Sequence, residues 1–180
     1  MRILGLVLLG WLSLQAAEIK PQAGDYVRLE VAKTGLLRGK VHVFEFPEYG
    51  GSLNEARDAF EIRLASGKIV VKDDWVKPAD LKKILEFTLK DVLAAKEHPE
   101  IVYRSTEVVK NGKEATAKGN LTIRGIVRTA VVKLKEVGEG VYEGKSEVDM
   151  REFKLKPPSA MFGTIGTEPL MKLKFRLSVR

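Results

Sequence analysis

The chain has 180 residues, which is enough for one domain whose core needs no covalent cross-link. It contains no cysteine, so disulfides, a thiolate nucleophile, a cysteine-bound iron–sulfur cluster and lipidation at a cysteine are excluded. The 31 basic and 24 acidic residues give a formal net charge of +7. This charge fits either transient contact with an anionic membrane surface or simple solubility. Nucleic acid is not expected as a partner, because no basic run is interleaved with aromatic residues.

Residues 1–17 predict a signal peptide. Arg2 is followed by an apolar stretch over residues 3–14 and then by Ala16 and Ala17. An apolar stretch of roughly 12 residues is too short for a membrane-spanning helix but matches the core of a signal peptide. We therefore expect cleavage near Ala17 and a periplasmic mature protein of residues 18–180, with an uncleaved membrane anchor as the alternative.

Alternating apolar and polar residues predict strands along most of the remaining chain. The longer runs cover residues 26–33, 40–46, 59–64, 101–109, 114–123, 129–137, 141–150 and 171–180, and a short further run covers 68–72. The segments KNGK at 110–113 and GEG at 138–140 predict hairpin turns, and the composition of PEYGG at 47–51 predicts another turn.

Residues 78–96 predict one helix. Leu81, Leu85, Leu89 and Val92 recur at helical spacing, and Pro78 suits the first turn. The apolar face of this helix leaves two interpretations open. The helix is either a lid that closes a ligand cavity through Leu85 and Leu89, or an element fixed against the wall of the sheet.

The predicted fold class is mainly β, a single eight-stranded antiparallel β-barrel with one helix between strands. Closing the sheet into a barrel removes the exposed edges that many antiparallel strands would otherwise present. Eight strands leave an interior that side chains can fill or that can enclose one small ligand. A two-sheet sandwich produces the same alternation, so the pattern alone leaves both architectures open.

A family resemblance begins at residue 98, where HPEIVYRST is followed by a hairpin and then by GNLTIRGIVR. These segments resemble the YceI-like family of periplasmic polyisoprenoid-binding proteins, which have a lipocalin-like barrel. The residues that match the two motifs are Pro99, Ile101, Tyr103, Ser105, Gly119, Leu121, Thr122, Ile123, Gly125 and Arg128. Weaker similarity at 36–53 and 147–166 extends the resemblance over nearly all of the mature chain, although Val127 and Thr129 replace the family's usual Thr and Pro.

The resemblance implies that residues 18–180 form a lipid-binding barrel domain of an exported, non-enzymatic carrier, storage or scavenging protein. The implied ligand is a polyisoprenoid, an isoprenoid quinone or a fatty-acid-like lipid with its polar end at a mouth, and neither a cofactor nor a metal is expected. The candidate ligand-binding residues on the alternating faces and the helix are Leu29, Val31, His42, Phe44, Phe46, Phe60, Ile62, Leu64, Leu85, Leu89, Ile101, Tyr103, Leu121, Ile123, Val132, Leu134, Val148, Met150, Leu173, Phe175 and Leu177. From the pattern alone, these rows fit equally well a core in which they pack against each other.

The polar residues give little support for catalysis. The chain has no GxSxG, HExxH, P-loop or GxGxxG motif, and two distant histidines without a cysteine predict no metal site. His42 shares a strand face with Phe44 and Phe46, so we interpret it as a structural histidine or as a contact for the polar end of a ligand. Asp73 and Asp74 are interpreted as carboxylates that favour the positive end of the helix.

Two other functions remain open at this stage. One is an envelope interaction module with a solid core, and the other is a small-molecule hydrolase or isomerase that uses His42. The oligomeric state, a homodimer included, is left open by the sequence.

Overall fold

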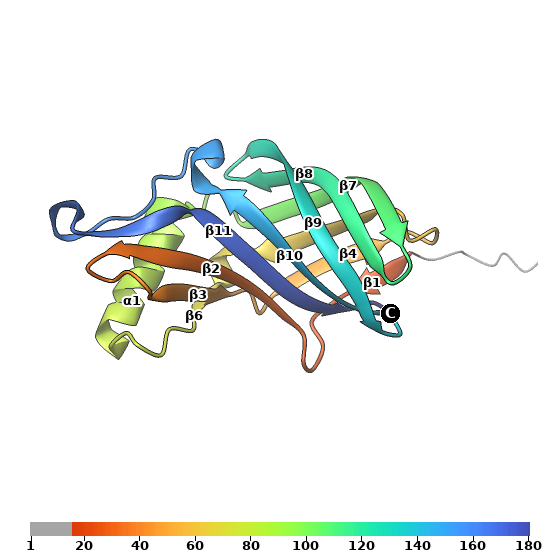
Figure 1. The fold of residues 1–180 in the computed structure, drawn as a ribbon, viewed down its shortest axis with the longest axis horizontal. Helices are drawn as coiled ribbons and strands as arrows, with labels where there is room; N and C mark the ends of the chain where they lie inside the picture. Colours follow the sequence, from red (N-terminus) through yellow and green to blue (C-terminus); the bar gives the residue numbers. More distant parts are fainter. Residues whose placement is uncertain (1–15) are drawn as a thin grey trace, which may run out of the picture.

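The computed structural model describes residues 16–180 and places them mainly in one antiparallel sheet (Figure 1). Its strands are β1 (Ala17–Ile19), β2 (Tyr26–Gly35), β3 (Val41–Glu45), β4 (Tyr49–Leu53), β5 (Phe60–Ala65), β6 (Val70–Val71), β7 (Glu100–Asn111), β8 (Glu114–Ile123), β9 (Ile126–Gly138), β10 (Val141–Asp149) and β11 (Ile165–Ser178). Their order in the sheet is β1-β4-β5-β7-β8-β9-β10-β11-β2-β3-β6. The sheet curls, so that β9, β10 and β11 lie across from β4 and β7 (Figure 1).

The mainly antiparallel, lipocalin-like architecture is confirmed, but the predicted count of eight strands is wrong, because β1 and β4 were not predicted and the short run at 68–72 forms a further strand, β6. β1 and β2 lie in line beside β11, since Ile19 bridges Val179 where the pairing with β2 has ended. β3 and β4 likewise lie in line, because β3 pairs with β2 and β4 pairs with β1. A short 3₁₀ turn, η1 (Ser66–Lys68), separates β5 from β6, which pair with β4 and β3.

The predicted turn at residues 47–51 is a further error, because Tyr49–Leu53 is β4. One of the glycines that suggested a turn, Gly51, instead allows two strands to approach closely. A Cβ added at Gly51 would lie 2.1 Å from the backbone oxygen of Glu61 on β5, so a larger residue would push the strands apart. Composition alone does not distinguish this use of glycine from its use in a turn.

Both predicted hairpins are confirmed. Asn111 pairs with Glu114 across the β7–β8 turn, and Gly112 adopts the left-handed backbone with φ of 59°. Gly140 has a φ of 66° in the β9–β10 connection, where Gly138 pairs with Val141. At these positions the sequence signal is local, so no tertiary contact overrides it.

The short strand β1 closes the sheet at the end where the C-terminus lies. Ala17 pairs with Leu53 on β4, and the backbone groups of Glu18 and Arg180 exchange hydrogen bonds of 2.6 and 3.0 Å. At the other end of the molecule β6 pairs only with β3, and the helix α1 (Pro78–Phe87) lies there (Figure 1). The helix and β1 therefore lie at opposite ends of the curled sheet.

The predicted helix is confirmed at its start but ends earlier than residue 96. α1 passes into one π-helical turn, η2 (Thr88–Val92), in which the Leu93 N–H donates to the Thr88 oxygen at 2.8 Å. The Thr88 hydroxyl also donates to the Ile84 oxygen, which widens the helix at this point. Ala94 then takes a left-handed φ of 46°, and the chain turns inward to bury Ala95.

The segment before the helix is fixed to the sheet by Asp73, whose side chain is fully buried. Its Oδ1 accepts the Val43 N–H at 2.7 Å, and its Oδ2 lies 2.5 Å from Nδ1 of His42. Trp75 stacks at 5.1 Å from the His42 ring and donates to the Val41 oxygen. Asp73 therefore binds the connection to β3. The sequence had suggested that its carboxylate favours the positive end of the helix, but the structure uses it in the contact with β3 instead.

We predict that Asp73→Ala lowers the free energy of unfolding by about 2–4 kcal/mol, because it leaves a buried N–H and an imidazole without their acceptor. Asp74→Ala is the matched control, since Asp74 is exposed and its loss should cost less than about 0.5 kcal/mol. Urea unfolding followed by tryptophan fluorescence measures both. Equal effects of the two substitutions would contradict the structural role of Asp73.

Candidate functional site

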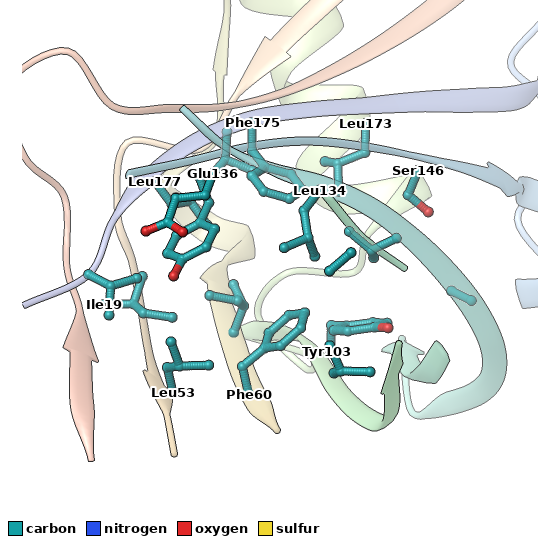
Figure 2. A pocket seen from close by; sticks show the side chains of 18 of the residues that line it. Ile19, Leu53, Phe60, Tyr103, Leu134, Glu136, Ser146, Leu173, Phe175 and Leu177 are labelled. Atoms are coloured by element: carbon teal, nitrogen blue, oxygen red, sulfur yellow. The ribbon is translucent and has the colours of Figure 1, made fainter. Parts of the chain in front are cut away.

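A cavity of about 220 Å³ lies inside the curled sheet. Figure 2 shows Leu53, Phe60 and Tyr103 on one wall, and Leu173, Phe175 and Leu177 on the wall opposite. The other apolar residues that line it are Ile19, Val27, Ile62, Leu64, Ile101, Val108, Ala115, Leu121, Ala130, Val132, Leu134, Val148 and Val179. The interior thus offers an almost wholly apolar surface.

Twelve of the predicted ligand-binding residues line this cavity. They are Phe60, Ile62, Leu64, Ile101, Tyr103, Leu121, Val132, Leu134, Val148, Leu173, Phe175 and Leu177. They come from β5, β7, β8, β9, β10 and β11, so strands distant in sequence converge on one space. Their role in binding stays a prediction.

Nine predicted residues do not line this cavity, and their role in binding also stays a prediction. They are Leu29, Val31, His42, Phe44, Phe46, Leu85, Leu89, Ile123 and Met150. Most are buried or partly buried in the apolar core. Leu85 and Leu89 pack against this core from the helix, which favours the fixed helix over the lid.

The inward rows of three strands change from apolar to polar at one end. On β7 the row of Ile101, Tyr103 and Val108 ends in Lys110. On β9 it ends in Glu136, and on β10 it ends in Tyr142. Together with Arg57, Lys113 and Glu114, these residues form what we call the mouth, defined as Arg57, Lys110, Lys113, Glu114, Glu136 and Tyr142.

The connection between β4 and β5 folds across the mouth. Arg57 has a left-handed φ of 53°, and its Nη1 donates to the Tyr142 hydroxyl at 3.3 Å. Nζ of Lys110 donates to the Ala56 oxygen at 3.3 Å, and the Asn54 side chain accepts the N–H groups of Asp58 and Ala59. These bonds order a loop that places the Arg57 guanidinium at the edge of an apolar space.

The polar groups inside the cavity are already satisfied by the protein. The Tyr103 hydroxyl donates to the Ala117 oxygen at 3.1 Å, and burial raises the pKa of Tyr103 to about 12, so that it stays protonated at neutral pH. The Ser146 hydroxyl donates to the Val131 oxygen at 2.8 Å. Over residues 16–180, no buried side-chain nitrogen or oxygen lacks a partner, so no buried polar side chain needs a ligand to satisfy it.

The side chains around His42 do not form a recognisable catalytic arrangement. His42 pairs with Asp73 outside the cavity, beside Trp75, and no nucleophile forms a hydrogen bond with it in the described chain. Within residues 16–180, no group of three or more His, Cys, Asp or Glu is arranged to hold a metal ion. In the same range, no helix has the length and apolar character needed to cross a membrane.

The sequence could have indicated part of the mouth. Extending the alternation of β7 to Lys110 and that of β9 to Glu136 shows where each apolar row stops. Arg57 lies in an irregular loop, where no periodicity predicts the direction of a side chain. Ile19 and Leu53 were missed because their strands are short and were not predicted.

Comparison with known proteins identifies relatives along most of the chain. Residues 26–178 match the family model of the YceI-like domain. A UPF0312 protein of Pseudomonas aeruginosa is 31% identical over 75 residues, which are 37% of this chain and 39% of that protein. A UPF0312 protein of Photorhabdus laumondii is 26% identical over 76 residues, so in both cases the match covers about two fifths of the relative.

Solved structures share the fold at low sequence identity. BcnA of Burkholderia cenocepacia has a TM-score of 0.64 at 16% identity, and the match covers 86% of this chain and 96% of that one. A polyisoprenoid binding domain of Saccharophagus degradans, implicated in plant cell wall breakdown, has a TM-score of 0.64 at 7% identity. That match covers 92% of this chain and 99% of the domain.

We predict that Gly144→Ala destabilises the wall of the cavity. A Cβ at Gly144 would lie 2.2 Å from the ring of Phe175, its partner on β11, so the ring must move. Such overpacking costs about 1–3 kcal/mol. Gly67→Ala is the control, because a Cβ there meets no atom within 4 Å. Chemical denaturation of both variants tests this, and a loss of stability at Gly67 as large as that at Gly144 would refute it.

Proposed function

Because this chain belongs to the YceI-like family, we propose that it binds one amphiphilic lipid, with the apolar tail in the cavity and the polar end at the mouth. The proposal rests on one observation, an apolar cavity whose buried polar side chains are hydrogen-bonded within the protein and whose polar residues gather at one end, the mouth. An apolar tail loses water on entry and leaves no protein group unpaired, whereas a polar molecule would lose its hydrogen bonds.

The size of the cavity bears on which tail it takes. At about 220 Å³, the cavity is large enough for several groups of methylene size. Each buried methylene contributes about 0.8 kcal/mol before the cost of ordering the chain. The candidate tails are those of a fatty-acid-like lipid, a polyisoprenoid or an isoprenoid quinone.

The comparisons support the class of ligand. The Saccharophagus degradans domain with the same fold is described as polyisoprenoid binding, and that property belongs to that protein. We carry over from it only that the curled sheet is a scaffold suited to an apolar chain. Carriage, storage or scavenging are roles that such binding would serve.

Export is part of the proposal and rests on the sequence. The predicted signal peptide lies almost wholly in residues 1–15, outside the described residues. The fold of residues 17–180 begins at the predicted cleavage site, because β1 starts at Ala17. Mass measurement of exported protein, with an expected first residue near Glu18, tests this, and retention of residues 1–17 in a membrane fraction would overturn it.

We predict that organic extraction of the purified mature protein releases about one lipid per chain, identified by mass spectrometry. We further predict that Leu121→Trp, which fills the cavity, lowers the affinity for a fluorescent fatty acid by at least about tenfold, since it takes the place of several methylene groups.

Val127→Trp is the matched control, because Val127 is exposed on β9 and does not line the cavity. It should leave both the extracted lipid and the affinity unchanged. A wild-type protein that yields no lipid and binds no probe would refute the proposal. A Leu121→Trp protein that is destabilised yet retains full binding would show that the ligand lies elsewhere.

A further inference from the structure

Three large apolar side chains are exposed together at the end of the molecule opposite the C-terminus. Leu36, in the β2–β3 connection, is 74% exposed, Met161 is 63% exposed and Phe162 is fully exposed. Met161 and Phe162 belong to η4 (Met161–Gly163), just before β11. The Leu36 N–H donates to the Thr164 oxygen at 3.1 Å, so the two connections are joined. We call Leu36, Met161 and Phe162 the apolar tip; its two loops extend at the left of Figure 1.

The backbone of the apolar tip is held in an unfavourable conformation. Met161 and Phe162 have φ of 49° and 55°, a left-handed region that large side chains rarely adopt. The turn is fixed by paired backbone bonds between Ala160 and Ile165, and the Thr164 N–H donates to the Met161 oxygen. Glycine or asparagine would suit these positions at lower cost, yet the chain places Met and Phe there and directs them into water.

The segments that carry the apolar tip are basic and have no acidic residue. Between Glu30 and Glu45 the charged residues are Lys33, Arg38 and Lys40, and between Glu152 and Glu168 they are Lys154 and Lys156. All of these except Lys33 are exposed. Apolar side chains surrounded by cations complement a surface with anionic head groups above an apolar layer.

We propose that the apolar tip docks the protein onto the surface of an anionic phospholipid bilayer. Leu36 and Phe162 enter the boundary between head groups and acyl chains, while Arg38 and Lys40 contact the phosphates. Three side chains on two narrow loops are far smaller than the roughly 800 Å² per partner of a stable protein interface, which favours a bilayer over a protein. The docking does not depend on the proposed ligand, since the mouth lies at the other end of the sheet.

The test is co-sedimentation of the purified mature protein with vesicles of phosphatidylglycerol and phosphatidylethanolamine, compared with phosphatidylcholine vesicles. We expect binding to the anionic vesicles that weakens with salt. Phe162→Ser and Leu36→Ser should each lower the partition coefficient by about tenfold or more, because each removes an apolar side chain that enters the bilayer. Arg38→Gln should lower it about fivefold on anionic vesicles only.

Val109→Ser and Val131→Ser are the matched controls, since both residues are exposed apolar positions outside the apolar tip. They should bind as the wild type does. Because all the changed side chains are exposed, an unchanged melting temperature checks that every variant is folded. The proposal fails if the protein binds neither vesicle type, or if the Phe162 and Leu36 variants bind as well as the controls. It also fails if these variants instead abolish a dimer, which would make the tip an interface between copies.

Discussion

The last strand, β11, is the element on which the rest of the structure depends. It pairs with β10 along one side, and along the other side it pairs with β2 and then bridges β1 at Val179. The sheet can curl back on itself only because one long strand serves both of these neighbours in succession. Its outward row of Lys174 and Arg176 pairs with Glu30 and Glu143 at the surface, where such pairs contribute little. The buried apolar side chains of its inward row therefore make the main contribution of β11 to the stability of the fold.

That inward row belongs to both the core and the cavity. Met171, Phe175 and Leu177 are all buried in the apolar core, and Phe175 and Leu177 also line the cavity together with the wall formed by β4, β5 and β7. Large rings are accommodated next to glycines, since Phe175 lies over Gly144 and Tyr103 lies close to Gly119.

The sequence predicts which residues face inward better than it predicts what they meet. Alternation at period two places Leu121 and Phe175 inside correctly, and it places Phe44 inside as well, with a relative exposure of 7%. It cannot tell that Phe175 lines the cavity and Phe44 does not, because that difference depends on which parts of the folded chain approach each side chain. The strand breaks escape prediction for a related reason, because Gly51 is needed for contact with β5 and not for a turn.

The positions of the mouth and the apolar tip constrain how the two proposals combine. The tip extends at one end of the molecule, and the β7–β8 turn, which carries Lys113 of the mouth, lies at the other end (Figure 1). A protein resting on a bilayer by its apolar tip would thus open its cavity away from that bilayer. Exposing an apolar tail to water costs about 0.8 kcal/mol for each methylene group, which disfavours free passage back to the membrane. Docking and binding together therefore disfavour exchange of the lipid with the bilayer on which the protein rests. They favour a protein that keeps its lipid near the membrane or passes it to an acceptor facing the mouth.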